Sequence, residues 1–412
     1  MSLKKKSVKN TVVGLDIGTS KIICIIGELD DGGNLNIIGF GKHPSTGLKR
    51  GVVVNIDATV ASIQRAVEQA EEMAGLQVRD VYVGIAGSHI RSFNSNGIVA
   101  ISAGEVIHAD VDRVVDAARA VAIPADQKIL HILPQEFIID QQDGIREPIG
   151  MAGVRLEVKV HIVTGAVSSA QNIDRCVRQC GLSPADIILE QLASSYSVLS
   201  DDEKELGVCL IDIGAGTTDI AVFTQGAIRH TAVIPLGGDQ VTSDLAIAFR
   251  MPPRAAESFK VKHAGCMVKL ASDSENIQLS GAADRSAKFV SEKSVAQIVQ
   301  ARYEELFRLV LSELRRSGFD AVIPSGIVVT GGASRVNHLI DLAETVFEMP
   351  VRVGTPENLL GIDGVVDNPS CSTAVGLLHY GLKQAHDGDE RTNKKSGGSF
   401  FTQVKNWFKG NM

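Results

Sequence analysis

Residues 210–219 read Leu-Ile-Asp-Ile-Gly-Ala-Gly-Thr-Thr-Asp, and residues 14–21 read Gly-Leu-Asp-Ile-Gly-Thr-Ser-Lys. Each stretch follows an apolar run and leads into another, a pattern that predicts two strands joined by a tight glycine turn. Backbone N–H groups in such a turn can approach an anion closely because glycine has no Cβ atom. We therefore expect two similar halves that hold one polyphosphate from opposite sides, with two ordinary hairpins as the alternative.

Both turns carry an aspartate and hydroxyl residues at matching positions. Asp16 and Asp212 each end a predicted strand, where one carboxylate oxygen can hold a hydrated divalent cation. The glycine and hydroxyl residues expected to hold phosphate are Gly18, Thr19, Ser20, Gly214, Gly216, Thr217 and Thr218. Lys21 follows the first turn and is either a phosphate contact or a solvated lysine.

The composition is that of a globular protein with a sizeable core. The chain has 412 residues, of which 44% are hydrophobic and 22% charged, so we expect two domains or one bilobed body. A net charge of −7 argues against a general nucleic-acid binder. No apolar run reaches the roughly 18 to 20 residues of a membrane-spanning helix, and residues 1–10 lack the apolar stretch of a signal peptide.

Six scattered cysteines are expected to remain reduced, as in a cytosolic protein. Cys176 and Cys180 are four residues apart and would share a helix face, so a metal pair is the alternative. No second cysteine pair or nearby histidine supports that alternative.

Strand and helix patterns divide the chain into two α/β halves, each interrupted by an insert. Asp57 is expected to cap a helix that ends at Gly75. Residues 201–205 are predicted to form a charged turn. Residues 373–384 are predicted to form a closing helix. The predicted parts are a first core (11–85, 165–205 and 370–385), an inserted α+β unit (86–164), a second core (206–239 and 326–369), a second insert (240–325), a flexible linker (386–399) and a terminal amphipathic helix (400–412).

Five segments in order resemble the signature of the actin-like ATPase superfamily. They are the two phosphate motifs at 16–21 and 212–219, two connecting helices at 190–196 and 374–378, and an adenosine motif, Val-Val-Thr-Gly-Gly-Ala, at 328–333. Within this superfamily, the runs at 47–56 (Gly-Leu-Lys-Arg-Gly-Val-Val-Val-Asn-Ile), 132–137 (Ile-Leu-Pro-Gln-Glu-Phe) and 372–380 (Ser-Thr-Ala-Val-Gly-Leu-Leu-His-Tyr) are similar to the FtsA family of bacterial cell-division proteins.

The resemblance implies an actin-like bilobed fold of two duplicated, mixed-sheet, ribonuclease-H-like domains with an α+β insert in each. It implies ATP and Mg²⁺ as ligands, with Asp16 and Asp212 facing the metal mostly through water. Nucleotide contacts would add Lys21, Gly238, Glu257, Lys260, Gly331, Gly332 and Ala333. Glu257 and Lys260 are alternatively a surface ion pair. Glu190 would orient the hydrolytic water, or it is simply an acidic residue at a helix N-terminus.

The tail places its aromatic residues on one helical face. Lys405 and Lys409 lie off that face, and the last residues from Arg391 onwards include five basic and no acidic side chains. A short, basic, aromatic helix of this kind fits the surface of an anionic membrane, whereas docking on the protein body is the alternative. The residues of the apolar face are Phe400, Phe401, Val404, Trp407 and Phe408.

By this resemblance the chain is expected to be a MgATP-binding cytoskeletal protein with at most slow ATPase activity. It would form filaments, lie peripherally on the cytoplasmic face of the bacterial inner membrane at the division site, anchor FtsZ there through the second insert, and recruit later division proteins. The early insert would be a protein-contact surface or a stabilising addition. A sugar-kinase relative is disfavoured because no candidate general base is apparent, and a pilus-assembly relative because that branch lacks the amphipathic tail.

Overall fold

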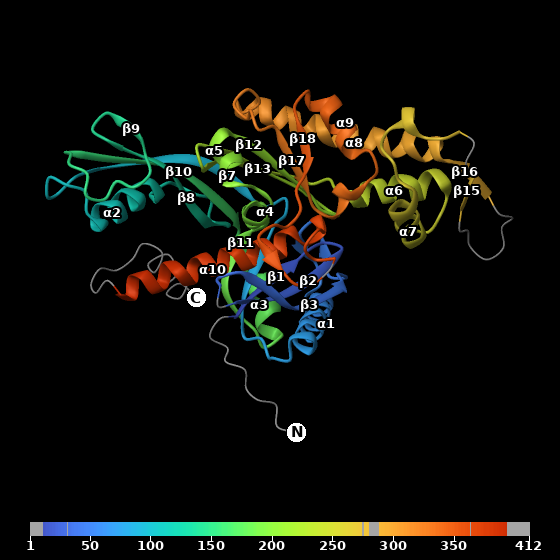
Figure 1. Ribbon diagram of the computed structural model, residues 1–412, viewed down its shortest axis with the longest axis horizontal. Coiled ribbons are helices and arrows are strands. Elements are labelled where there is room, and N and C mark those ends of the chain that lie inside the picture. Colours follow the sequence, from blue (N-terminus) through green and yellow to red (C-terminus); the bar gives the residue numbers. More distant parts are fainter. Residues whose placement is uncertain (1–10, 31, 274–275, 280–287, 363, 394–412) are drawn as a thin grey trace, which may run out of the picture.

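The computed structural model describes residues 11–393, apart from residue 31, residues 274–275, residues 280–287 and residue 363. The amphipathic tail predicted at 400–412 therefore lies outside the described residues. Figure 1 shows two lobes, one containing β1 to β3 and the other β12, β13, β17 and β18, with an insert projecting from each side of the second lobe.

The first half is built on a six-stranded sheet with the order β11-β6-β1-β2-β3-β19. The apolar strands between residues 11 and 44 form an antiparallel meander, as predicted, and β6 and β11 add in parallel beside β1. The strands are β1 (Thr11–Ile17), β2 (Lys21–Leu29), β3 (Leu35–Pro44), β6 (Asp80–Ile85), β11 (Ser183–Leu189) and β19 (Leu359–Leu360), and the short pair β4 (Leu48–Lys49) and β5 (Val52–Val53) lies apart.

The second half repeats this plan in a five-stranded sheet, β14-β13-β12-β17-β18. A meander of three strands is again followed by two parallel strands on the other side of its first strand. The prediction of two duplicated mixed sheets is therefore confirmed, with β1 and β12 in equivalent central positions. The strands are β12 (Val208–Ile213), β13 (Thr218–Thr224), β14 (Ala227–Ile234), β17 (Ile327–Thr330) and β18 (Val351–Val353).

The early insert forms its own sheet, β7-β10-β8-β9, covered on one face by α2. It packs against β14 of the second half, where Gln135 Nε2 donates to Ile228 O at 2.9 Å and Ser92 Oγ donates to Thr231 O at 2.8 Å. The long strand β8 stays paired with β10 past Pro134, because a bulge at Gln135 absorbs the irregularity. The elements are β7 (Arg91–Ala100), α2 (His108–Arg119), β8 (Gln127–Ile139), β9 (Gln142–Ile145) and β10 (Arg155–Ala166).

The remaining helices connect and cover the two sheets. The second insert contains a long helix, α8, which packs on α6 and α9. The elements are α1 (Ile56–Ala74), α3 (Val167–Gln179), α4 (Glu190–Val198), α5 (Asp201–Leu206), α6 (Gly238–Phe249), α7 (Pro253–His263), β15 (Asn276–Leu279), β16 (Lys288–Ser291), α8 (Glu292–Ser317), α9 (Leu339–Phe347), α10 (Ser372–Asn393) and the 3-10 turns η2 (Val268–Leu270), η3 (Gly332–Arg335) and η4 (Pro369–Cys371).

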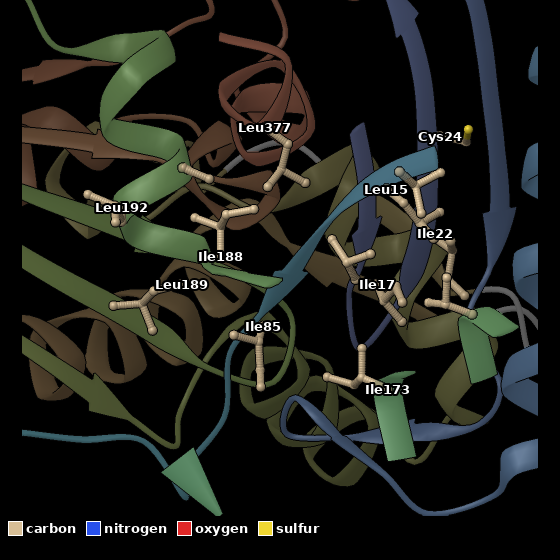
Figure 2. Packing of buried hydrophobic residues seen from close by; sticks show 14 of the residues in the cluster. Leu15, Ile17, Ile22, Cys24, Ile85, Ile173, Ile188, Leu189, Leu192 and Leu377 are labelled. Carbon is tan, nitrogen blue, oxygen red and sulfur yellow. The ribbon is translucent and has the colours of Figure 1, made fainter. Parts of the chain in front are cut away.

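Helices α4 and α10 join the two halves through a shared apolar core. Figure 2 shows Leu15 and Ile22 of the first sheet, Leu192 of α4 and Leu377 of α10 in one buried cluster. That cluster extends to Leu210 of the second sheet, so the halves are joined at the base of the cleft between them. Among the described residues no helix is long and apolar enough to cross a membrane.

Two predicted helix features are wrong in detail. Asn55, not Asp57, caps α1, and its side-chain oxygen accepts from Ala58 N at 3.0 Å. The helix begins one residue before Asp57, and asparagine caps a helix as well as aspartate does.

The charged turn predicted at 201–205 is the helix α5. Ser200 Oγ accepts from Glu203 N at 3.2 Å and Glu203 Oε2 accepts from Ser200 N at 2.9 Å, a reciprocal cap that starts a helix.

The linker predicted at 386–399 begins too early. Helix α10 continues to Asn393, so residues 386–393 are helical. The sequence in this stretch contains a single glycine and no proline, and its aspartate at 387 stands four residues before an arginine at 391. One internal glycine costs only about 1 kcal/mol and such a charge pair favours the helix. The rest of the predicted linker lies outside the described residues.

The described cysteines are free thiols. Five of them are buried, Cys180 is partly exposed, and Cys180 Sγ donates to Cys176 O at 3.2 Å as an ordinary helix contact. Nothing in the described part of the chain supports the alternative of a metal-binding cysteine pair, because no group of three or more potential ligands is close enough together there.

Candidate functional site

A cavity of about 390 Å³ opens where the two central strands end. Both predicted glycine turns line it, together with the first turn of α4 and the third glycine turn after β17. The structure thus brings together residues that lie far apart in the sequence, from Asp16 to Thr373. The predicted residues that line the cavity are Asp16, Gly18, Thr19, Ser20, Lys21, Glu190, Asp212, Gly214, Gly216, Thr217, Gly238, Glu257, Lys260, Gly331, Gly332 and Ala333.

The two glycine turns have the same internal hydrogen bond and meet each other. Gly18 N donates to Lys21 O at 3.1 Å, and Gly214 N donates to Thr217 O at 2.9 Å. A Cβ atom on Gly216 would lie 2.9 Å from Thr19 Oγ1, so only glycine allows the second turn to approach the first this closely. The two predicted turns therefore meet at one cavity, and the polyphosphate expected between them stays a prediction.

Thr218 is a correction to the predicted site. Its side chain is fully buried, and Thr218 Oγ1 donates to Leu236 O at 2.9 Å, so the hydroxyl faces away from the cavity. The reason is the alternation of side chains along β13, which places Thr217 and Asp219 on the cavity side and Thr218 on the opposite side. Thr217 Oγ1 donates to Asp219 Oδ2 at 2.9 Å.

Four of the carboxyl groups that line the cavity have raised pKa values. Burial raises the pKa of Asp16 to about 7, against the lowering effect of Lys21, and burial raises the pKa of Asp219 to about 8, with Asp212 adding to the shift. Burial also raises the pKa values of Asp212 and Glu190. Burial is thus the main cause of all four shifts, and a cation bound nearby would lower these pKa values.

The carboxyl groups fit a hydrated divalent cation better than a directly ligated one. Asp219 Oδ1 is buried without a hydrogen-bond partner. In the part of the chain that the structure describes, no three His, Cys, Asp or Glu side chains are placed to ligate one metal ion together. A cation beside Asp16 and Asp212 would therefore be reached mainly through its own water ligands, which suits Mg²⁺.

Lys21 lies near Asp16 and Asp212 in the same cavity. Its side chain lines the cavity, and burial lowers its pKa while Asp16 opposes that shift. The ammonium nitrogen would lie 3.4 Å from a Cβ atom placed on Gly332. The structure thus places the Lys21 charge between the first and third glycine turns.

At the far end of the cavity, Glu257 and Lys260 form the expected pair on one face of α7. Lys260 Nζ lies 2.7 Å from Glu257 Oε2, and it donates to Gly238 O at 3.0 Å and to Thr242 Oγ1 at 2.9 Å. The ion pair lines the cavity, and the nucleotide contact expected for these two residues stays a prediction.

Several lining residues were not singled out from the sequence. Tyr303, on the buried face of α8, donates from its hydroxyl to Ala333 O at 2.7 Å and supports the third glycine turn. Asp219 could have been found from the sequence, because it is the last residue of the second phosphate motif at 212–219. Further lining residues include Lys42, Arg335 and Asn337, as well as Thr373, which lies in the run at 372–380 that resembles the FtsA family.

We expect the ligand-free protein to lose stability as the pH rises through the range in which these carboxyls ionise. An aspartate in the unfolded chain ionises near pH 4, whereas Asp16 in the folded protein ionises at about 7. The stabilising effect of the retained proton is complete below the unfolded pKa and is lost as the pH passes the folded one. Asp16→Asn cannot ionise, so its free energy of unfolding should exceed that of the wild type by an increasing margin, reaching a few kcal/mol at about pH 8.

Urea unfolding of both proteins between about pH 5 and pH 8 measures this difference. Asp202→Asn, at an exposed position, is the control for removing one charge and should follow the wild type at every pH. A constant difference between Asp16→Asn and the wild type across the range would contradict the explanation.

The comparisons with known proteins identify relatives over nearly the whole chain. A family model described as "Cell division protein FtsA" matches residues 209–376, and one described as "SHS2 domain inserted in FTSA" matches residues 87–164. A "Cell division protein FtsA" from Pseudomonas aeruginosa is 56% identical over 410 residues, covering 97% of this chain and 98% of the relative. That from Neisseria meningitidis is 47% identical over 404 residues, with 97% and 98% covered.

Solved structures show the same actin-like fold at low sequence identity. The "PilM-PilN type IV pilus biogenesis complex" superposes with a TM-score of 0.67 at 16% identity, covering 90% of this chain and 98% of that chain. A crystal structure of MreB 5 of Spiroplasma citri bound to AMPPNP gives a TM-score of 0.58 at 13% identity, covering 94% and 100%.

Proposed function

The chain belongs to the FtsA family of cell-division proteins, and from this premise we propose that it binds MgATP and links the division machinery to the membrane. It forms actin-like filaments at the bacterial inner membrane, anchors the FtsZ ring there and recruits later division proteins. The observation that supports nucleotide binding is the cavity in which two equivalent glycine turns meet beside buried carboxyls.

The residues around the cavity divide into a phosphate end and a nucleoside end. Backbone N–H groups of the turns at Gly18 and Gly214 face the phosphates, and Lys21 supplies a positive charge between them. Asp16 and Asp212 accept hydrogen bonds from the water ligands of Mg²⁺, which, when bound, neutralises phosphate charge. The nucleoside lies along Gly331, Gly332 and Ala333, with its sugar near Glu257 and Lys260.

Glu190 is the residue proposed to orient a hydrolytic water. Burial raises its pKa well above the usual range, and Asp16, Asp219 and Asp212 raise it further. Its side chain lies at the N-terminus of α4 and lines the cavity, and we expect at most slow ATP hydrolysis by the proposed site.

The proposed membrane and FtsZ contacts rest on other parts of the chain. The division into a first core, an early insert, a second core and a second insert at the boundaries given above is part of the proposal, with FtsZ meeting the second insert at 240–325. The tail at 400–412 would hold the protein peripherally on the cytoplasmic face of the inner membrane. Its basic and aromatic residues support that role.

Recruitment of FtsZ to lipid vesicles tests this function. Fluorescent FtsZ is expected to float with anionic vesicles when the full chain and ATP are present, and to stay in solution when the chain ends at residue 397. Vesicles of neutral lipid are the control for the charge of the tail. If the full chain floats with the vesicles but leaves FtsZ in solution, the anchoring role is wrong.

A further inference from the structure

Two hydroxyl groups donate hydrogen bonds to one oxygen of the Asp212 carboxylate. Ser194 Oγ donates to Asp212 Oδ2 at 2.6 Å, and Thr373 Oγ1 donates to the same oxygen at 3.3 Å. The two hydroxyl oxygens lie 3.0 Å apart. All three side chains are buried, so water does not compete for these hydrogen bonds.

The other oxygen of this carboxylate lies against Gly331, which lines the cavity. A Cβ atom on Gly331 would come within 2.3 Å of Asp212 Oδ1, and Gly331 has a φ of +89°, a backbone conformation that favours glycine. Asp212 and Thr373 line the cavity, whereas Ser194 is not among its lining residues. Ser194 can therefore influence a ligand only through Asp212.

The two hydroxyls come from the helices that join the two halves, and the carboxylate comes from the second sheet. Asp212 lies near the end of β12, whereas Ser194 belongs to α4, which packs on strands of both sheets, and Thr373 belongs to α10, which packs on β1, β2 and β6 of the first sheet. The backbones of α4 and α10 touch: a Cβ atom on Gly376 would lie 1.9 Å from Ala193 O. This contact fixes the spacing of the two hydroxyls.

We infer that Ser194 and Thr373 are positioning residues that orient the Asp212 carboxylate toward the water shell of a bound cation. The inference rests on the proposed MgATP site. Both hydroxyls bind Oδ2, which stops rotation of the carboxylate and leaves Oδ1 directed at the cavity. Removing a hydrogen-bond partner of a metal-facing carboxylate typically lowers the affinity for the metal by about 10- to 100-fold. The Mg²⁺ requirement of nucleotide binding should therefore depend on helices α4 and α10.

Magnesium titrations of the full-length protein test this role. With a fluorescent ATP analogue at fixed concentration, Ser194→Ala should need about tenfold more Mg²⁺ for half-maximal binding. Thr373→Val, which removes the hydroxyl at nearly equal volume, should shift in the same direction. Thr373→Ser keeps the hydroxyl and should behave as the wild type. In EDTA all variants should bind the analogue alike, since the hydroxyls act through the cation.

Ser197→Ala is the matched control. Ser197 lies on the same helix and in the same contact, but its hydroxyl donates to Ser372 O at 2.7 Å and to Ser194 O at 3.0 Å, not to Asp212. Thermal unfolding without nucleotide shows whether each variant is folded. Equal magnesium shifts for Ser194→Ala and Ser197→Ala, or no shift for Ser194→Ala and Thr373→Val, would overturn the inference while leaving the proposed site intact. A wild-type protein that binds the analogue without any need for Mg²⁺ would overturn both.

Discussion

Asp212→Ala is expected to weaken Mg²⁺-dependent nucleotide binding by about tenfold or more while the protein stays folded. The change removes the carboxylate of the second half that faces the proposed cation, without altering the apolar strand around it. Stability should be kept, because the buried carboxyl is costly to ionise and the Ser194 and Thr373 hydroxyls, 3.0 Å apart, can bond to each other when it is gone. Titration of a fluorescent ATP analogue in Mg²⁺ buffer measures the effect.

Asp202→Ala is the control for this variant, since it removes one exposed carboxylate outside the cavity. It should bind the analogue as the wild type does. If Asp212→Ala also binds with unchanged affinity, the two-sided arrangement around phosphate and metal is not how the protein binds nucleotide.

Trp407→Glu is expected to release the protein from anionic vesicles and to leave nucleotide binding unchanged. The tryptophan belongs to the apolar face predicted for the tail helix. A glutamate there must be buried in the membrane interface or lift the helix out, and either outcome costs several kcal/mol against a helix whose whole affinity is of that order. Flotation with anionic vesicles beside a nucleotide titration measures both properties.

Asn406→Glu introduces the same charge on the opposite side of that helix and is the matched control. It should weaken flotation only slightly, through its repulsion by anionic lipid. Flotation of Trp407→Glu at the wild-type level would mean that the tail does not bind the membrane through this face. Loss of both flotation and nucleotide binding would instead mean that the tail packs on the protein body.

The strands and glycine turns of both halves could be predicted from the sequence because their determinants are local. An apolar run followed by Asp-Ile-Gly specifies a strand and a turn within ten residues, and the duplication reveals the two-sided cavity. The errors arose where two local signals compete. Asn55 and Asp57 are both good helix caps, and the acidic residues after Ser200 suit a turn or the first turn of a helix equally well.

The rest of the site depends on tertiary structure. Thr218 shares a motif with Thr217, and only the alternation along β13 shows that its hydroxyl faces Leu236 instead of the cavity. Tyr303 reaches Ala333 from the middle of a long helix that carries no motif. The contact of Ser194 and Thr373 with Asp212 requires the packing of α4 on α10, which pattern and spacing do not specify.

A crystal structure of the protein with Mg²⁺ and a non-hydrolysable ATP analogue tests the central claim most directly. The account predicts phosphate density between the turns at Gly18 and Gly214, a metal ion whose water ligands contact Asp16 and Asp212, and the nucleoside against Gly331 and Gly332. Nucleotide density outside this cavity, or phosphates held by one half alone, would contradict it.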